Sequence, residues 1–197
     1  MTNNKKYVNK IVEIHMQTFR GFFLTFLGRG FLKYLYQGFM EEPESGIIVA
    51  IEHHEPIGFI AYSENISNCY KYLIRKHLIA FAWYGFLGFI RNPRILFRLL
   101  RAFTYSDNSK RDEEYMELLS IGVLPNDKNQ GIGTAMIEKL VSITDFNRLM
   151  YIKLETDRDN NEGANYFYQK NGFLLDHHYV TPEGRRMNEY RYYRGDL

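Results

Sequence analysis

Cysteine, tryptophan and proline are scarce in this chain of 197 residues, which contains one, one and five of them, respectively. The single cysteine, Cys69, has no partner for an intramolecular disulfide. No CxxC pair and no His and Cys spacing of a zinc site is present. These absences indicate a protein of a reducing compartment, and we expect it in the cytoplasm.

A signal peptide, a membrane-spanning run and a strong charge of either sign are also lacking. No apolar stretch follows the polar residues 1–10. The longest apolar run, residues 78–90, is too short to span a bilayer and is typical of a buried helix or an interfacial segment. The net charge of +2 gives no reason to expect a nucleic-acid partner. The length and the 45% hydrophobic content predict a single domain over residues 1–197.

The hydrophobic pattern predicts an α/β (α+β) fold. Apolar residues at helical spacing predict helices over residues 7–19, 29–40, 131–145 and 161–171. Short apolar runs predict strands over residues 46–51, 57–62, 115–123, 151–156, 173–180 and 187–194. Residues 70–103 interrupt the strands, and Asn92-Pro93 divides them into two predicted helices.

The loop KNQGIGT at residues 128–134 lies between a predicted strand and a predicted helix. Gly131 and Gly133 leave backbone N–H groups unhindered at the positive end of that helix, which favours a pyrophosphate site. The loop has neither the GxxxxGK[ST] nor the GxGxxG spacing of the common nucleotide-binding loops. Two glycines at a helix start also permit close packing, so the loop alone leaves both interpretations open.

A second motif follows about thirty residues later. Asn161-Glu-Gly-Ala164 precedes Phe167-Tyr168 and Gly172-Phe173. With ELLSIGVLP at residues 117–125 and the KNQGIGT loop, it resembles the signature of the GNAT superfamily of acetyl-CoA-dependent N-acyltransferases. The order of predicted elements also resembles that of the family. Two features depart from it: Lys128 stands where the family has Arg or Gln, and no clear strand precedes Tyr7.

The resemblance implies a single GNAT-like domain with a mixed, mostly antiparallel central sheet flanked by helices. It implies a basic helical insertion at about residues 66–112, between the third and fourth strands of the family pattern. Acetyl-CoA is the implied cosubstrate, with no metal, and its pantetheine arm would lie between two splayed central strands. The implied cosubstrate-binding residues are Ile121, Gly122, Val123, Lys128, Asn129, Gln130, Gly131, Ile132, Gly133, Thr134, Asn161, Ala164 and Tyr168.

Direct attack of an amine on the thioester needs a base, and the departing thiolate benefits from an acid. Strict strand alternation would place Glu117 on one face with Leu119, Ile121 and Val123, which makes Glu117 the candidate base. An ordinary exposed or salt-bridged glutamate is the alternative interpretation, and Glu155 and Glu64 are weaker candidates.

Tyr168 occupies the family's position for the general acid, and a hydroxyl with a reference pKa of about 10 stays protonated at neutral pH. A core tyrosine is the alternative. A backbone N–H near Val123 would stabilise the oxyanion.

The insertion carries most of the positive charge. Residues 71–111 contain nine Lys or Arg and one Asp, a net charge of +8, which leaves −6 for the rest of the chain. Arg91, Arg94, Arg98 and Arg101 recur at helical spacing. Five interpretations remain: a solvated basic face, a roof that attracts an anionic acceptor, a peripheral contact with an anionic membrane through residues 70–103, a homodimer contact, and, although no nucleic acid is expected from the net charge, a nucleic-acid contact.

These motifs together predict an acetyltransferase that acts on an amine of a small molecule, with an amino sugar or nucleotide-linked sugar as the first candidate acceptor. The alternative is a non-catalytic acyl-CoA-binding or membrane-associated module with the same fold. His77 and the pairs His53-His54 and His177-His178 are interpreted as surface or turn residues rather than metal ligands.

Overall fold

A six-stranded sheet forms the centre of the molecule in the computed structural model, which describes residues 4–91, 113–127 and 130–195. Its strand order is β1-β2-β3-β4-β6-β5. The strands are β1 (Ser45–Glu52), β2 (Glu55–Ser63), β3 (Tyr115–Val123), β4 (Tyr151–Asp157), β5 (Leu174–Val180) and β6 (Arg186–Tyr192). Only the β3–β4 pair is parallel. The prediction of a mixed, mostly antiparallel sheet is therefore confirmed.

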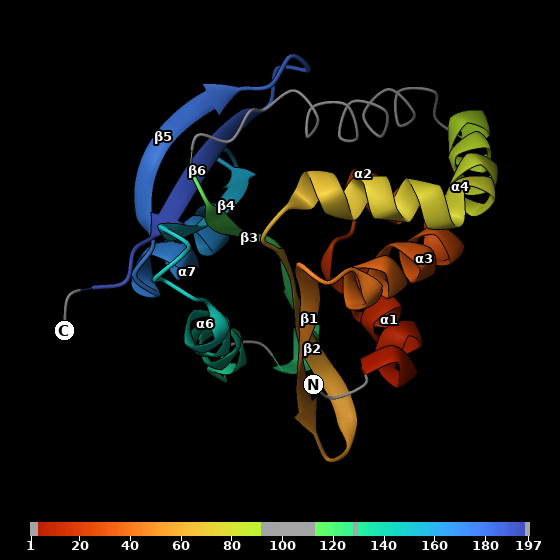
Figure 1. Cartoon of the computed structure of the whole chain (residues 1–197). Coiled ribbons are helices and arrows are strands. Elements are labelled where there is room, and N and C mark those ends of the chain that lie inside the picture. The colour runs from red at the N-terminus through yellow and green to blue at the C-terminus, as the bar shows by residue number, and fades with distance from the viewer. Residues whose placement is uncertain (1–3, 92–112, 128–129, 196–197) are drawn as a thin grey trace.

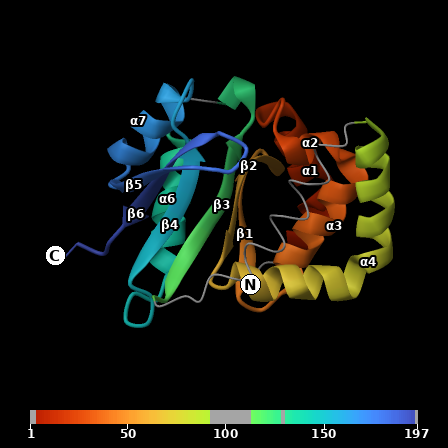
Figure 2. The same ribbon diagram turned by 90° about the horizontal axis from the view of Figure 1, so that it is seen from above.

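Helices cover both faces of this sheet (Figures 1 and 2). The helices are α1 (Val8–Thr18), α2 (Phe23–Phe26), α3 (Gly28–Glu41), α4 (Ile66–Arg91), α6 (Ile132–Ile143) and α7 (Glu162–Lys170), with short 3-10 turns at Asn4–Tyr7 and Pro125–Asp127. In both views α1, α3 and α4 lie on one side of the sheet, and α6 and α7 lie on the other. Every predicted helix and strand within the described residues is present, with small shifts of its ends.

Two hydrophobic cores follow from this arrangement. The α1–α3 core includes Phe31 and Tyr36 together with Phe59 and Ala61 of β2. The α6–α7 core includes Ile60, also of β2, together with side chains of α6, α7, β4 and β6. Because neighbouring residues of β2 are buried in different cores, this strand is apolar on both faces, which explains its continuous apolar sequence.

The turns agree with the local sequence. His53 and His54 join β1 to β2 with φ angles of 47° and 67°, as a two-residue hairpin turn requires. Gly172 has a φ of 84° just after α7, so it provides the left-handed residue that commonly ends a helix. Gly184, in the turn between β5 and β6, also has a positive φ.

The helical insertion begins at the residue that the family resemblance implies, and four residues before the apolar pattern that starts at residue 70. α4 starts at Ile66 and continues to Arg91, with a kink at His77, where φ is −123° and ψ is 24°. The predicted break at Asn92-Pro93 lies outside the described residues. Among the described elements, α4 lies between β2 and β3. The family pattern has one additional strand at its start, so β2 and β3 correspond to its third and fourth strands. No helix within the described residues is long and apolar enough to cross a membrane.

A β-bulge interrupts β3 and overturns the prediction of strict alternation. Ser120 pairs with Ala61 and Leu118 pairs with Tyr62, so Leu119 is an extra residue in β3. Leu118 lies in the α6–α7 core before the bulge, and Ile121 and Val123 pack against the same core after it. Because Glu117 precedes the bulge, its side chain and those of Ile121 and Val123 are on opposite faces of the sheet. The prediction that they share a face is wrong.

Candidate functional site

The two central parallel strands separate after only three residue pairs. The last pair joins Glu117 of β3 to Lys153 of β4. Beyond it, residues 118 and 120–123 still pair with β2 on their other edge, and residues 154–157 still pair with β6. The facing edges of β3 and β4 thus form a wedge whose backbone groups can pair with an extended ligand.

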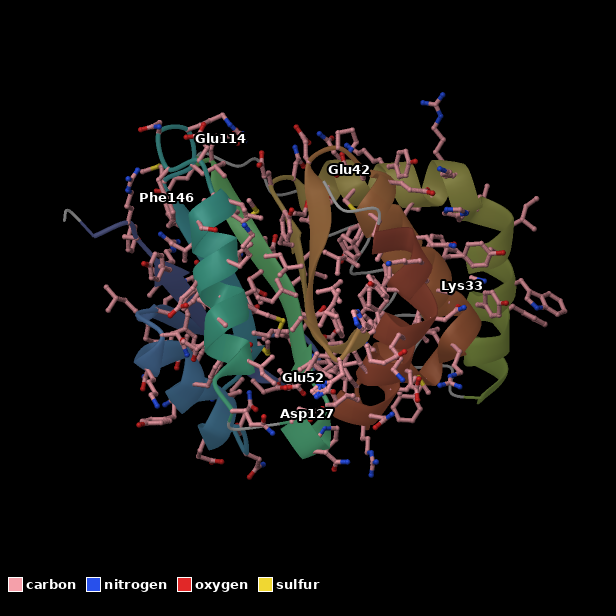
Figure 3. All side chains as sticks on the ribbon, turned by 90° about the horizontal axis from the view of Figure 1, so that it is seen from below. Lys33, Glu42, Glu52, Glu114, Asp127 and Phe146 are labelled. Atoms are coloured by element: carbon pink, nitrogen blue, oxygen red, sulfur yellow. The ribbon has the colours of Figure 1, made fainter. Side chains whose placement is uncertain are left out.

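Two helices begin at the open end of this wedge. β3 and β4 run in the same direction, α6 follows the end of β3, and α7 follows the end of β4. Figure 3 labels Glu114 and Asp127, which lie just before and after β3, and shows α6 beginning near Asp127. The first N–H groups of α6 and α7 have no acceptor inside their helices, and they carry the positive end of the helix dipole. An anionic group at this end of the wedge would therefore find donors.

The structure requires glycine at positions 131 and 133 of the predicted loop for two different reasons. Gly131 precedes α6 with a φ of 80°, and a side chain there would meet nothing within 4 Å, so the left-handed backbone explains the glycine. At Gly133 a β-carbon would lie 2.9 Å from Phe167 Cζ, so close contact between α6 and α7 explains it. Gln130 is exposed, while Ile132 and Thr134 are half-buried in the first turn of α6. Lys128 and Asn129 lie outside the described residues.

Asn161 fastens the start of α7 to the end of β4. Its Nδ2 donates to Thr156 Oγ1 at 2.7 Å and to the Asp157 carbonyl oxygen at 3.1 Å. Ala164, one turn later, packs against the α6–α7 core. Both motif residues are therefore on the α7 side of the wedge.

Asn165 is a polar residue that the sequence interpretation missed. Its Nδ2 donates to the carbonyl oxygens of Asp157 and Asn161. Its Oδ1 accepts from Asn188 Nδ2 at 2.8 Å and from the Tyr190 hydroxyl at 2.9 Å. The spacing of four from Asn161 was the available signal, since such residues share a helix face.

Tyr168 packs in the α6–α7 core and is only 8% exposed. Its ring centroid lies 6.0 Å from that of Phe173 and 6.1 Å from that of Tyr190. Burial raises the pKa of Tyr168 to about 12. The hydroxyl is therefore neutral at physiological pH and can donate a proton or a hydrogen bond.

Glu117, at the apex of the wedge, is half-buried and electrostatically coupled to neighbouring side chains. Burial lowers the pKa of Lys153, but the charges of Glu155 and Glu117 outweigh it, so the pKa is raised and Lys153 stays charged. Burial and the charge of Glu117 raise the pKa of Tyr70 on α4. Sequence reasoning missed Lys153 and Tyr70, because strand pairing and the path of α4 bring them to Glu117.

The two weaker candidates for a base have other partners. The Tyr179 hydroxyl donates to Glu155, whose Oε1 lies 2.8 Å from Lys153 Nζ. Glu64 pairs with Arg148. Glu155 lies two residues beyond Lys153 and therefore on the same face of β4.

A cluster of charged side chains occupies the same sheet face on β5 and β6. Asp176, His177 and Glu189 have ligating atoms within 4.8 Å of one another. Arg191 lies 3.3 Å from Asp176, and Lys153 lies 3.3 Å from the buried Glu189, so cationic side chains already neutralise both carboxylates. His177 and His178 are exposed surface residues of β5, and His53 and His54 form a turn, as predicted for both pairs.

A sequence model described as the acetyltransferase (GNAT) family matches residues 8–173 of the chain. No curated protein sequence shows significant similarity to it.

Several solved structures share its fold. One, proposed to be a GNAT-family acetyltransferase of Desulfovibrio desulfuricans, is 14% identical, with a TM-score of 0.60 over 98% of this chain and 94% of that one. An N-acetyltransferase of Staphylococcus aureus Mu50 is 16% identical, with a TM-score of 0.58 over 95% and 96%. A protein of Bacillus anthracis, proposed to be a streptothricin acetyltransferase and solved with acetyl coenzyme A, is 18% identical, with a TM-score of 0.53 over 81% and 68%.

Proposed function

Because the chain belongs to the acetyltransferase (GNAT) family and uses acetyl-CoA, we propose that it transfers the acetyl group to an amine of a small molecule. The observation that carries this proposal is the separation of β3 and β4 beyond Glu117 and Lys153, with two helix N-termini at its open end. An extended thioester substrate needs such an unpaired strand edge beside a site for its phosphates.

The pyrophosphate of acetyl-CoA would bind the N–H groups of residues 130–134, with Lys128 as a nearby cation. The pantetheine arm would pair with the backbone of Ile121, Gly122 and Val123. Since Asn161 Nδ2 is held by Thr156 and Asp157, its Oδ1 is the atom to accept a hydrogen bond from the arm. Ala164 leaves room beside it.

The reaction would proceed by direct attack. Glu117, directly or through a water, removes a proton from the acceptor ammonium, and the free amine attacks the thioester carbonyl carbon. A backbone N–H near Val123 stabilises the oxyanion. After attack the nitrogen is cationic. As the C–S bond breaks, Tyr168 donates a proton to the departing thiolate, and the nitrogen passes its excess proton, directly or through a water, to the resulting tyrosinate, so that free thiol and a neutral amide leave. The Tyr168 pKa of about 12 keeps its proton in place until the thiolate forms.

An amino sugar, free or nucleotide-linked, is the acceptor that we propose. Glu117 and Glu155 lie near the apex of the wedge with Lys153 as a cationic neighbour of both, so the two carboxylates and one ammonium leave a net negative charge that suits the ammonium of an acceptor. The net charge of +8 over residues 71–111 suits an anionic carrier such as a nucleoside diphosphate.

The test is release of free thiol from acetyl-CoA with nucleotide-linked amino sugars, free amino sugars, polyamines and peptides as acceptors. We expect turnover with an amino sugar, and a kcat reduction of about 10²-fold or more for both Glu117→Gln and Tyr168→Phe. Glu52→Gln and Tyr166→Phe are matched controls, since both residues are exposed, and Tyr166 lies on the same helix as Tyr168. Coenzyme A binding without turnover on any acceptor would favour the non-catalytic module instead.

A further inference from the structure

The outer surface of α4 is apolar where a solvent-facing helix is normally polar. After the kink at His77, four large apolar side chains are exposed: Leu78 at 59%, Ile79 at 87%, Trp83 at 59% and Phe86 at 55%. These four residues are the α4 apolar stripe. No charged residue interrupts the sequence from 78 to 90.

The stripe occupies one side of the helix. At about 100° per residue, its members lie within a sector of about 140°. The opposite side faces α3: Phe81 is buried, its ring centroid lies 4.9 Å from that of Phe31, and Tyr84 lies against Gly30. Packing against α3 thus explains the inner apolar face, whereas the outer face is exposed in the part of the chain that the structure describes. Exposed apolar clusters of this kind mark interaction sites.

This part of α4 lies at the periphery of the molecule. Figures 1 and 2 both show it at the outer edge, beside α3 and on the opposite side of the molecule from α7. Contact through the stripe would therefore leave the open end of the β3–β4 wedge accessible.

The charges of α4 indicate which kind of partner binds the stripe. By sequence, α4 contains Lys71, Arg75, Lys76 and Arg91 and no acidic residue; Arg75 is exposed just before the kink, and Lys76 beside it pairs with Glu41 of α3. A symmetric dimer through the stripe would bring two such basic helices together, which is unfavourable. An anionic surface attracts them, and tryptophan, phenylalanine and leucine are typical of the apolar face of a helix that lies at a membrane interface.

We propose that the α4 apolar stripe docks the protein on an anionic lipid membrane, with Leu78, Ile79, Trp83 and Phe86 inserted among the headgroups. The contact is peripheral, since no described helix can span a bilayer. This inference is independent of the acceptor and of the catalytic roles proposed above.

Trp83 is the only tryptophan of the chain, so its fluorescence reports the contact directly. The full chain is titrated with phosphatidylcholine vesicles, with and without about one third phosphatidylglycerol. We expect the Trp83 emission to shift to shorter wavelength and to become protected from an aqueous quencher with the anionic vesicles, and binding to weaken as salt is added. No shift with anionic vesicles, or an equal response to both lipids, would overturn the proposal.

A triple variant, Leu78→Ser with Ile79→Ser and Phe86→Ser, keeps the reporter and should weaken binding at least about tenfold. Ile51→Ser with Ile143→Ser and Met150→Ser is the matched control, because these exposed apolar residues lie on other elements. Arg75→Glu, an exposed change outside the core, tests the charge separately and should weaken binding several-fold. Without lipid, sedimentation measures the oligomeric state and the quencher measures the accessibility of Trp83. A dimer in which Trp83 is protected from the quencher would show that the stripe binds a second copy of the chain, and would overturn the membrane proposal.

Discussion

Gly133 on α6 and Phe167 on α7 approach so closely that a β-carbon on the glycine would lie 2.9 Å from Phe167 Cζ. The first turn of α6 is therefore in contact with the second turn of α7. A change in this spacing would move the proposed phosphate donors of α6 relative to Asn161 and Ala164 on α7.

Gly133→Ala should consequently weaken both stability and acetyl-CoA binding. Overpacking costs about 1–3 kcal/mol, and the better helix propensity of alanine returns about 1 kcal/mol, so we expect the free energy of unfolding to fall by about 1 kcal/mol. The KM for acetyl-CoA should rise. Urea unfolding and initial rates measure the two effects. Gly163→Ala on α7 is the control, because nothing lies within 4 Å of its β-carbon; equal stabilisation by both changes would refute the packing argument.

Gly131→Ala tests backbone strain in the same loop without any steric contact. A β-carbon there meets nothing within 4 Å, but the φ of 80° is unfavourable for alanine by about 1–2 kcal/mol. We expect that loss in the free energy of unfolding, or else a rotated loop with a higher KM for acetyl-CoA. Gly131→Asn should recover most of it, since asparagine tolerates the left-handed region. Equal behaviour of the two variants would show that φ is not what selects glycine.

Periodicity and turn chemistry predict the secondary structure of this chain well, but not how one strand is paired. Strict alternation from Glu117 fails because the β-bulge at Leu119 depends on the register with Ala61 and Tyr62, and those residues are more than fifty positions away in the sequence. The pairing of β3 with β4 ends after Glu117 and Lys153, and this too depends on how two distant strands meet, so neither strand's own sequence predicts it. The motifs therefore indicate which residues gather near the cosubstrate, but not the face to which Glu117 points.

The kink in α4 is a second feature that the pattern does not predict. No helix-breaking proline such as Pro93 lies near His77 in the sequence, yet the φ and ψ angles of His77 are not helical. The ring centroid of His77 lies 4.9 Å from that of Tyr34. The bend coincides with this contact to Tyr34 of α3, which lies more than forty positions earlier in the sequence, so local periodicity does not predict it. Beyond the bend, Leu78 and Trp83 are exposed and Phe81 lies in the core.

A buried histidine makes stability depend on pH below neutrality. His15 Nδ1 lies 2.6 Å from the Tyr36 hydroxyl, and burial lowers the pKa of His15 to about 4. Between the ordinary histidine pKa of 6.5 and the lowered pKa of about 4, His15 is protonated in the unfolded chain but not in the folded chain. The folded state therefore loses stability as the pH falls through this range. We expect the free energy of unfolding to be about 2 kcal/mol lower at pH 5 than at pH 7 from this group.

In the His15→Gln variant, glutamine still offers a polar partner to Tyr36, but its side chain does not titrate. Urea unfolding at the two pH values should therefore show a difference that is smaller by about 2 kcal/mol than in the unchanged protein. The same pH dependence in both proteins would assign it to other groups.

The proposed acid role of Tyr168 makes a prediction about alkaline pH. Because burial raises its pKa to about 12, the hydroxyl remains almost fully protonated at about pH 10.5, where a tyrosine with an ordinary pKa would be about three-quarters ionised. The ratio of kcat for the unchanged enzyme to kcat for Tyr168→Phe should then be the same at about pH 8 and pH 10.5. Tyr166→Phe, measured in parallel, corrects for general alkaline losses. A ratio that falls about fourfold at the higher pH would mean that the proton donor has an ordinary pKa, and a ratio near one throughout would remove Tyr168 from the chemistry.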